Sequence, residues 1–267
     1  MSTDTREALA FVRALDFSNV PHKRLHTASR DLSEDGAAAV ASTQIFDSAK
    51  SQAQVAGSGV FSFAQGVDPD VRAAISDSAL LAQLVANQKI SAEDKPLEWF
   101  AAYFDVLTKI GWTLQESAWT DYSADGTAVA VHDKILEVMS AALGPSPAAL
   151  AILTATINAL KSMNPSSPWL TIFNRESQKA RIARFQIGLV DKQADGDVFV
   201  SLLTCLVEAH SDITQVLFFK YKNGAATFKA SSGKVSINRP SLNELGPKIR
   251  EKISRFQSEY LSGVLSL

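Results

Sequence analysis

The chain has 267 residues, of which 46% are hydrophobic and 20% are charged, and its formal net charge is −2. This composition is that of an ordinary globular protein, and the length allows a sizeable core. The near-neutral charge argues against a nucleic-acid interface, which needs clustered lysine and arginine. It leaves open a local membrane contact made by apolar residues.

The first residues, from Met1 to Glu7, are polar and lack the apolar core of a secretory signal. No stretch approaches the ~18 apolar residues of a membrane-spanning helix. Ser2 takes the place of the glycine that N-myristoylation needs, and residues 264–267 contain no cysteine for prenylation. We therefore expect a cytoplasmic protein, with membrane association as the alternative.

Residues 1–67 carry the weakest pattern and are interpreted as a variable, helical N-terminal segment. Residues 7–15 predict a short amphipathic helix. Residues 35–56 are rich in Ala, Ser and Gln, which suits either a helix on a larger body or a mobile cover. The glycines of residues 56–60 indicate a break.

Residues 68–180 are predicted to be mainly helical. Asp68 is a typical N-cap, Pro69 suits the first helical position, and apolar residues then recur at helical spacing. Proline also opens the predicted helices that begin at residues 96, 147 and 168, and glycine or proline ends those over residues 96–111, 131–143 and 147–164. The predicted helices cover residues 68–88, 96–111, 131–143 and 147–164, and a shorter helix or a turn runs from residue 168 toward residue 179.

Residues 181–238 change to strand character. The pairs Asp195-Gly196 and Asn223-Gly224 separate apolar runs, as in β-hairpins. Strands that follow one another without helices between them favour an antiparallel sheet. One further strand is predicted within residues 112–122. The four main strands cover residues 184–190, 197–208, 214–221 and 227–237.

A closing helix within residues 240–265 completes the prediction, and its helical pattern runs from Pro247 to about Leu265. Its apolar stripe consists of Ile249, Ile253, Phe256, Tyr260 and Val264. The fold class is α/β (α+β-like), in a single domain that spans residues 1–267. It has a helical N-terminal part, an antiparallel sheet of four to five strands and a C-terminal helix.

Cys205 is the only cysteine, and it lies in an apolar run predicted as a strand. Alternation along the strand places Phe199, Leu203 and Val207 on the same face as Cys205. Both faces are largely apolar, so we expect the strand to be covered on both sides. Burial would raise the pKa of the thiol and make it a poor nucleophile in water.

Two interpretations of this thiol remain open on chemistry alone. A packed core cysteine is the commoner case, because free cysteine is among the most buried residue types. A thiol in apolar surroundings also suits a long acyl chain held as a thioester. At about 0.8 kcal/mol for each buried CH₂, a sixteen-carbon chain would contribute on the order of 10 kcal/mol.

Other candidate residues give weaker patterns. A turn near Glu208 could bring His210, a possible base, to Cys205. His22 and His26 have metal-ligand spacing but no third ligand, so no metal site is predicted. Residues 56–60 lack the rest of a phosphate or dinucleotide loop, and no serine-hydrolase elbow is present. The aromatic residues are interpreted mainly as core: Trp99, Phe100, Tyr103, Phe104, Trp112 and Trp119.

Four segments together resemble one family. They are Leu80 to Gln88, Trp99 to Trp112, Phe185 to Ile187 and Val216 to Tyr221, with the lone cysteine between the last two. In this order they are similar to the family of the bacterial virulence factor Evf, which has relatives in bacteria and fungi. The segment Tyr103-Phe-Asp-Val-Leu-Thr-Lys-Ile-Gly-Trp112 is the most specific part.

This resemblance implies a compact α/β fold with an internal acyl tunnel and a palmitoyl-type chain bound by thioester to one cysteine. Cys205 is the only residue here that can match that cysteine. The implied acyl donors are acyl-CoA or acyl carrier protein. No cofactor is expected other than covalently bound palmitate or a similar fatty acid. Phe199, Leu203 and Val207 become the candidate lining of the acyl chain.

Two functions from different classes follow. In the first, Cys205 forms a thioester with a long acyl chain, and the protein is a cysteine-dependent acyltransferase or a self-acylated, fatty-acid-binding lipoprotein. In the second, it is a non-enzymatic virulence effector, with Cys205 either carrying a palmitoyl membrane anchor or serving only as a packed side chain.

Overall fold

A computed structural model describes residues 3–20, 46–90, 95–114, 118–122, 128–144, 146–193, 196–222, 224–237 and 239–267. Its helices are α1 (Thr3–Ala14), α2 (Pro69–Lys89), α3 (Pro96–Lys109), α4 (Val131–Leu143), α5 (Pro147–Ser162), α6 (Pro168–Ser177) and α7 (Arg239–Tyr260). None of these helices has the length and apolarity needed to cross a bilayer.

The strands are β1 (Gln52–Ala56), β2 (Gly59–Phe63), β3 (Trp112–Leu114), β4 (Thr120–Tyr122), β5 (Val129–Ala130), β6 (Gln178–Lys179), β7 (Ile182–Lys192), β8 (Val198–Ala209), β9 (Lys220–Tyr221), β10 (Ala226–Ile237) and β11 (Leu265–Ser266). Strands β5 and β9 form a separate small pair. The others form a nine-stranded sheet in the order β11-β1-β2-β7-β8-β10-β3, with β4 on β10 and β6 on β7. The pairing of β2 with β7 is parallel, and the other strand pairs in the described residues are antiparallel.

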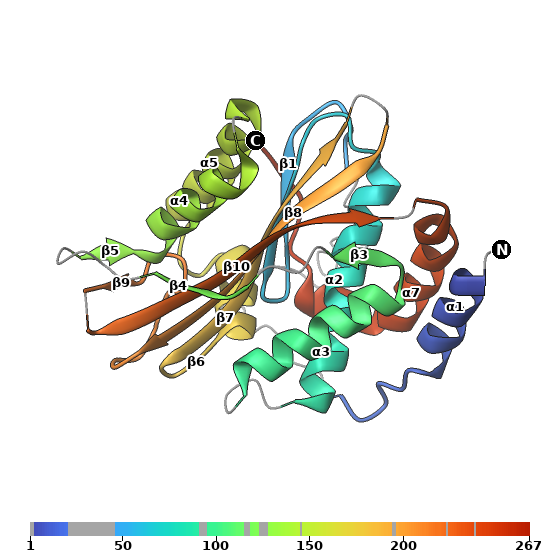
Figure 1. Cartoon of the computed structure of the whole chain (residues 1–267), viewed down its shortest axis with the longest axis horizontal. Helices are drawn as coiled ribbons and strands as arrows, with labels where there is room; N and C mark the ends of the chain where they lie inside the picture. Colours follow the sequence, from blue (N-terminus) through green and yellow to red (C-terminus); the bar gives the residue numbers. More distant parts are fainter. Residues whose placement is uncertain are drawn as a thin grey trace, which may run out of the picture.

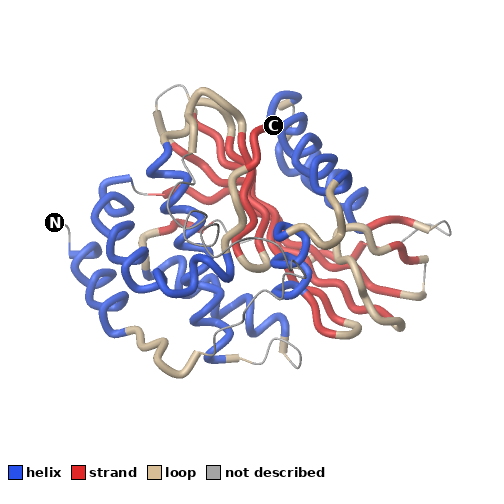
Figure 2. Tube along the Cα trace, turned by 180° about the vertical axis from the view of Figure 1, so that it is seen from behind, coloured by secondary structure: helices blue, strands red, loops and turns tan. Residues whose placement is uncertain are grey.

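Helices cover both faces of this sheet (Figures 1 and 2). Helices α1, α2, α3 and α7 pack on one face, where their apolar residues form the first core with Val198, Val200 and Leu202 of β8. Helices α4, α5 and α6 pack on the other face and form the second core with Leu203, Cys205 and Val207. Because successive strand residues point to opposite faces, β8 supplies both cores.

Polar contacts fix α2 and α7 relative to one another. The carboxylate of Asp77 on α2 is 2% exposed and accepts hydrogen bonds from Arg250 Nε (3.0 Å) and Gln257 Nε2 (3.0 Å) on α7. Burial raises the pKa of Asp77, and these two hydrogen bonds act against that rise. The pair of helices is therefore joined at a buried charge as well as by apolar packing.

The predicted helices are confirmed, because proline starts and apolar periodicity are local signals that tertiary packing did not override. The closing helix contains Pro247 in its interior and ends at Tyr260, and the residues near Leu265 form β11 instead. The prediction of a purely antiparallel sheet with four to five strands was wrong.

The sheet is larger because β1 and β2, which fall in the segment predicted as helix and break, form a hairpin at its edge. Gly57 at the turn has a φ of 55°, which a residue with a side chain rarely adopts. In the predicted strand 214–221 only Lys220 and Tyr221 are strand, and residues 112–122 hold two short strands, β3 and β4. Residues 35–45, His22, His26, Asp195 and Asn223 lie outside the described residues.

Candidate functional site

Cys205 lies near the middle of the sheet, on the face covered by α4 and α5. Its neighbours across the sheet are Phe185 on β7 and Ala230 on β10. The cysteine is 0% exposed. Helix α4 contributes Ile135 and helix α5 contributes Leu153 to the same apolar cluster. The thiol is therefore enclosed between the sheet and the helical layer.

The three residues predicted to line an acyl chain are placed differently from one another. Leu203 and Val207 are buried with Cys205 in the second core. Phe199 is half-buried, belongs to neither core and lies under Lys234, whose Nζ is 5.7 Å from the centre of its ring. Two of the three are therefore near the thiol, and Phe199 lies toward the other end of β8.

Burial raises the pKa of the Cys205 thiol well above its ordinary value, because the apolar cluster cannot solvate a thiolate. The thiolate is the reactive form, so the enclosed thiol is a weak nucleophile. The same enclosure would protect a thioester from water. Complete burial by itself therefore fits an acylated cysteine and a packed one equally well.

Tyr221 supplies the second polar group of this cluster. It lies on β9 opposite Val129 of β5, and it is 3% exposed. Its hydroxyl is buried and has no hydrogen-bond partner among the described residues. Burial, then the charge of Glu137, then that of Cys205, raise the pKa of Tyr221 to about 12. Tyr221 and Cys205 belong to the same buried apolar cluster, on the side of the sheet that α4 and α5 cover.

An unpartnered hydroxyl in an apolar cluster is unusual, since buried tyrosine hydroxyls normally find a partner. Leaving such a group unsatisfied costs about 1–3 kcal/mol. The sequence offered one signal of it, a tyrosine at the end of the apolar run Val216 to Tyr221. The sequence did not single it out, because nothing in that run shows that Tyr221 is buried in the cluster that contains Cys205.

No histidine is placed to act as a base on Cys205 in the described residues. Strand β8 continues through Glu208 to Ala209 without a turn, and His210 after it is exposed. Five residues of strand place His210 about 16 Å along β8 from Cys205. His132 at the start of α4 is 9% exposed, and its Nδ1 lies 3.2 Å from the carbonyl oxygen of Leu217.

The predicted aromatic core lies on the opposite face of the sheet. Trp99, Phe100, Tyr103 and Trp112 are buried in the first core, and Phe104 and Trp119 pack against it. They are therefore separated from Cys205 by the sheet. Among the residues that the structure describes, no three His, Cys, Asp or Glu side chains cluster as metal ligands.

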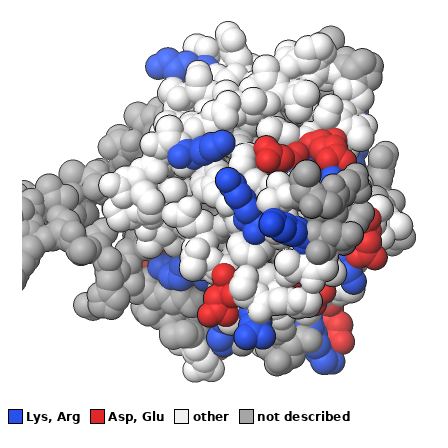
Figure 3. Space-filling model, turned by 90° about the vertical axis from the view of Figure 1, so that its left-hand side faces the viewer, with Lys and Arg blue, Asp and Glu red and all other residues white. Residues whose placement is uncertain are grey.

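The end of the molecule where β5 and β9 project has a mixed surface (Figure 3). Uncharged side chains cover most of the described part of this face, and Lys and Arg lie beside Asp and Glu. This view shows no broad patch of a single sign.

No protein-family model and no curated protein matches the sequence. Among solved structures the chain is similar to a delta-endotoxin, with a TM-score of 0.41 and 15% identity over 81% of this chain and 89% of that chain. It is similar to the Evf virulence factor, with a TM-score of 0.34 and 13% identity over 77% and 82% of the two chains. It is also similar to the activated Cyt2Ba monomer from Bacillus thuringiensis subsp. israelensis, with a TM-score of 0.38 and 13% identity over 67% of this chain and 96% of that chain.

The fold itself is of the α/β class, with a mixed sheet between two helical layers. Sequence identities of 13–15% with these structures do not assign a family. Membership of the Evf family stays a prediction.

Proposed function

We propose that the protein binds a long fatty acyl chain as a thioester on Cys205, with the chain held between the sheet and helices α4 and α5. The observation that carries this proposal is the unpartnered hydroxyl of Tyr221 in the same apolar cluster as the buried thiol. Buried hydroxyls normally have a hydrogen-bond partner. Tyr103 in the first core also lacks one, but of these two tyrosines only Tyr221 shares the cluster of Cys205. A thioester carbonyl on the sulfur supplies an acceptor.

The acylation step is a thiol exchange. The thiolate of Cys205 attacks the carbonyl carbon of an acyl thioester on coenzyme A or acyl carrier protein. A carbon–sulfur bond forms to Cys205, the bond to the donor sulfur breaks, and the donor leaves as a thiolate that takes up the proton lost by Cys205. The hydroxyl of Tyr221 donates a hydrogen bond to the carbonyl oxygen.

Access to the thiol requires movement of the helical layer, because Cys205 is 0% exposed. Protein interiors are close-packed, so an acyl chain must displace or separate side chains of the second core. Burial of sixteen carbons, worth on the order of 10 kcal/mol, is large enough to drive that rearrangement. Acylation therefore takes place with α4 and α5 apart from the sheet, and closure follows.

The acyl group has two possible fates. If it moves to an amine or hydroxyl acceptor, the protein is a transacylase working through an acyl-enzyme. If it stays, the protein is a self-acylated, lipid-carrying protein of the virulence-effector type, and an exposed chain would allow membrane contact. A labelled acyl group that leaves the protein only when an acceptor is added identifies the transacylase.

Intact-mass spectrometry tests the proposal. The protein is incubated with palmitoyl-CoA, and we expect a mass increase of one palmitoyl group that neutral hydroxylamine removes. Because the chain has one cysteine, removal by hydroxylamine locates the adduct without further mapping. Cys205→Ser and Cys205→Ala are the controls. An adduct of the same yield on Cys205→Ala, or no adduct on wild type, contradicts the thioester.

A further inference from the structure

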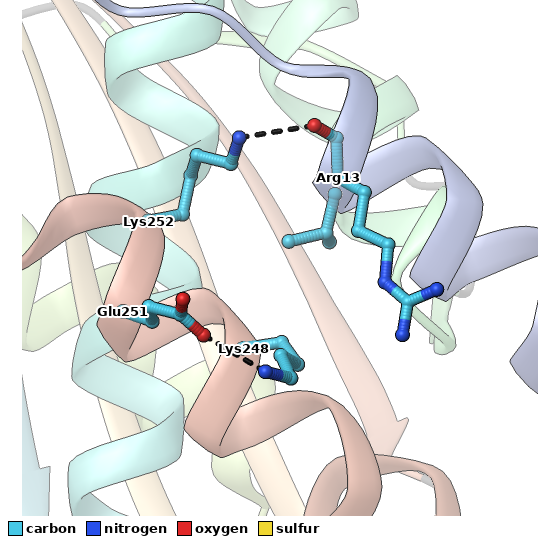
Figure 4. Close-up of a pocket in the computed structure, with 5 residues that line it drawn as sticks. Arg13, Lys248, Glu251 and Lys252 are labelled. Atoms are coloured by element: carbon cyan, nitrogen blue, oxygen red, sulfur yellow. Dashed lines mark hydrogen bonds and ion pairs between the residues drawn. The ribbon is translucent and has the colours of Figure 1, made fainter.

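A charged pocket of about 340 Å³ lies between α1 and α7 (Figure 4). It is lined by Val12 and Arg13 of α1 and by Lys248, Glu251 and Lys252 of α7. Val12 belongs to the first core, whereas Cys205 belongs to the second. The pocket is therefore on the other side of the sheet from the thiol, and it is independent of the function proposed above.

Hydrogen bonds on both sides of the pocket join α1 to α7. Lys252 Nζ donates hydrogen bonds to the carbonyl oxygens of Arg13 (3.0 Å) and Leu15 (2.7 Å) at the end of α1. Near the other end of α1, the hydroxyls of Thr5 and Ser241 are 3.1 Å apart. These contacts make the pocket a built feature of the α1–α7 packing.

The lining has an excess of positive charge, with three cations and one carboxylate. Lys248 Nζ is 2.9 Å from Glu251 Oε2, and Lys252 is bound to backbone carbonyls. The guanidinium of Arg13 has no hydrogen bond or ion pair within the part of the chain that the structure describes, and Arg13 is exposed. Asp16 and Arg255, which lie nearby with opposite charges, leave the excess unchanged.

Figure 4 shows the Arg13 side chain descending from α1, while the ammonium of Lys248 on α7 is turned toward Glu251. Cationic groups from both helices therefore border the same pocket. A guanidinium presents a planar fork that matches the oxygens of a phosphate, and an ammonium adds a point charge. The volume exceeds that of one phosphate group, so there is room for an organic group attached to it.

We propose that the pocket between α1 and α7 binds a phosphate monoester, with Arg13 and Lys248 contacting the phosphate from opposite sides. The phosphate monoester can come from a free metabolite or from a lipid headgroup, and both present the same dianion. Glu251 weakens the site by repulsion, which makes its replacement the sharpest test.

Isothermal titration calorimetry with glycerol 3-phosphate, glycerol and inorganic phosphate tests the site. We expect binding of the two phosphates but not of glycerol, and at least tenfold weaker binding of glycerol 3-phosphate by Arg13→Gln and by Lys248→Gln. Glu251→Gln should bind it more tightly than wild type. The matched control is Lys95→Gln, because Lys95 forms the same kind of surface pair, 2.9 Å from Glu98, outside this pocket.

The proposal is overturned if glycerol 3-phosphate gives no binding, or if Lys95→Gln weakens binding as much as Arg13→Gln does. It is also overturned if Glu251→Gln leaves the affinity unchanged. Unchanged urea midpoints of the variants establish that folding is intact. Sedimentation with phosphatidylcholine vesicles separates the two sources of the phosphate monoester. One set of vesicles contains phosphatidic acid, and the other contains phosphatidylserine at equal charge. A preference for phosphatidic acid identifies a lipid headgroup, and binding of the free compounds alone identifies a metabolite.

Discussion

The ring of Phe61 on β2 lies over Gly188, its partner on the parallel neighbour β7. A Cβ atom added to Gly188 would lie 2.5 Å from Phe61 Cδ1, closer than side chains tolerate. We expect Gly188→Ala to displace the buried Phe61 ring and to lower the free energy of unfolding by about 1–3 kcal/mol. Urea unfolding measures the change.

The same substitution at Gly246 in α7 should cost less than at Gly188. An added Cβ would lie 3.5 Å from Ala74 Cβ, an ordinary contact. Alanine is favoured over glycine in a helix interior by about 0.5–1 kcal/mol, but Pro247 follows directly and crowds a Cβ on the residue before it, so the two effects oppose one another. A loss of stability at Gly246 as large as that at Gly188 would show that the close approach of Phe61 does not govern Gly188.

The Cys205 thiol should react slowly with maleimide in the folded protein. Burial raises its pKa above that of a free thiol, so the folded state disfavours the thiolate. The free energy of unfolding should therefore fall as the pH rises above about 8.5, where the unfolded thiol ionises, and Cys205→Ala should lack this fall. Mass spectrometry measures labelling with and without urea; native labelling as fast as that of a free thiol would contradict the enclosure.

Tyr221→Phe removes only the unpartnered hydroxyl and should have opposite effects in the two forms of the protein. Without an acyl group it should raise the free energy of unfolding by about 1 kcal/mol, because a buried unsatisfied group is lost. In the palmitoylated form it should lower it by about 1 kcal/mol, because a hydrogen bond to the thioester is lost.

Tyr103→Phe is the matched control, since its hydroxyl is also buried without a partner among the described residues but lies in the first core. It should shift the urea midpoint equally in both forms. If Tyr221→Phe also shifts both forms equally, Tyr221 does not contact the acyl group.

Asp77→Asn should make the free energy of unfolding less dependent on pH. Because burial raises the pKa of Asp77, the folded state holds the proton more tightly than the unfolded state does. Its contribution to stability is therefore present at pH below about 4 and is lost as the pH rises through the raised pKa. We expect the stability of wild type relative to Asp77→Asn to decrease from pH 4 to pH 7, measured by urea unfolding at each pH. A difference that grows with pH would contradict the direction.

The sequence predicted the helices well because their signals are local. Pro69, Pro96, Pro147 and Pro168 each mark a helix start within the sequence itself. The hairpin of β1 and β2 was missed because each strand is only five residues long. Gln52, Ala53, Gln54 and Val55 alternate in polarity, but this run is too short to stand out in a segment rich in Ala, Ser and Gln. The hairpin's parallel partner β7 is more than a hundred residues away, and periodicity carries no information about such pairing.

At the candidate site the sequence located the thiol but not its surroundings. Strand alternation predicted that Leu203 and Val207 share the face of Cys205, because that rule needs only the chain direction. It did not identify Tyr221, which reaches the same cluster from the short strand β9. Which of several apolar segments covers a strand depends on tertiary packing that a single sequence does not reveal.

The strand order has a consequence for synthesis on the ribosome. The hairpin β1–β2 is made early, but its inner partner, β7, emerges only with residues 182–192, and its outer partner, β11, only with residues 265–266. Until then both edges of the hairpin present unpaired backbone groups, which invite pairing with other chains. A nascent chain of this protein therefore carries an unprotected sheet edge through most of its translation. This period of synthesis is the one in which a chaperone would be most needed.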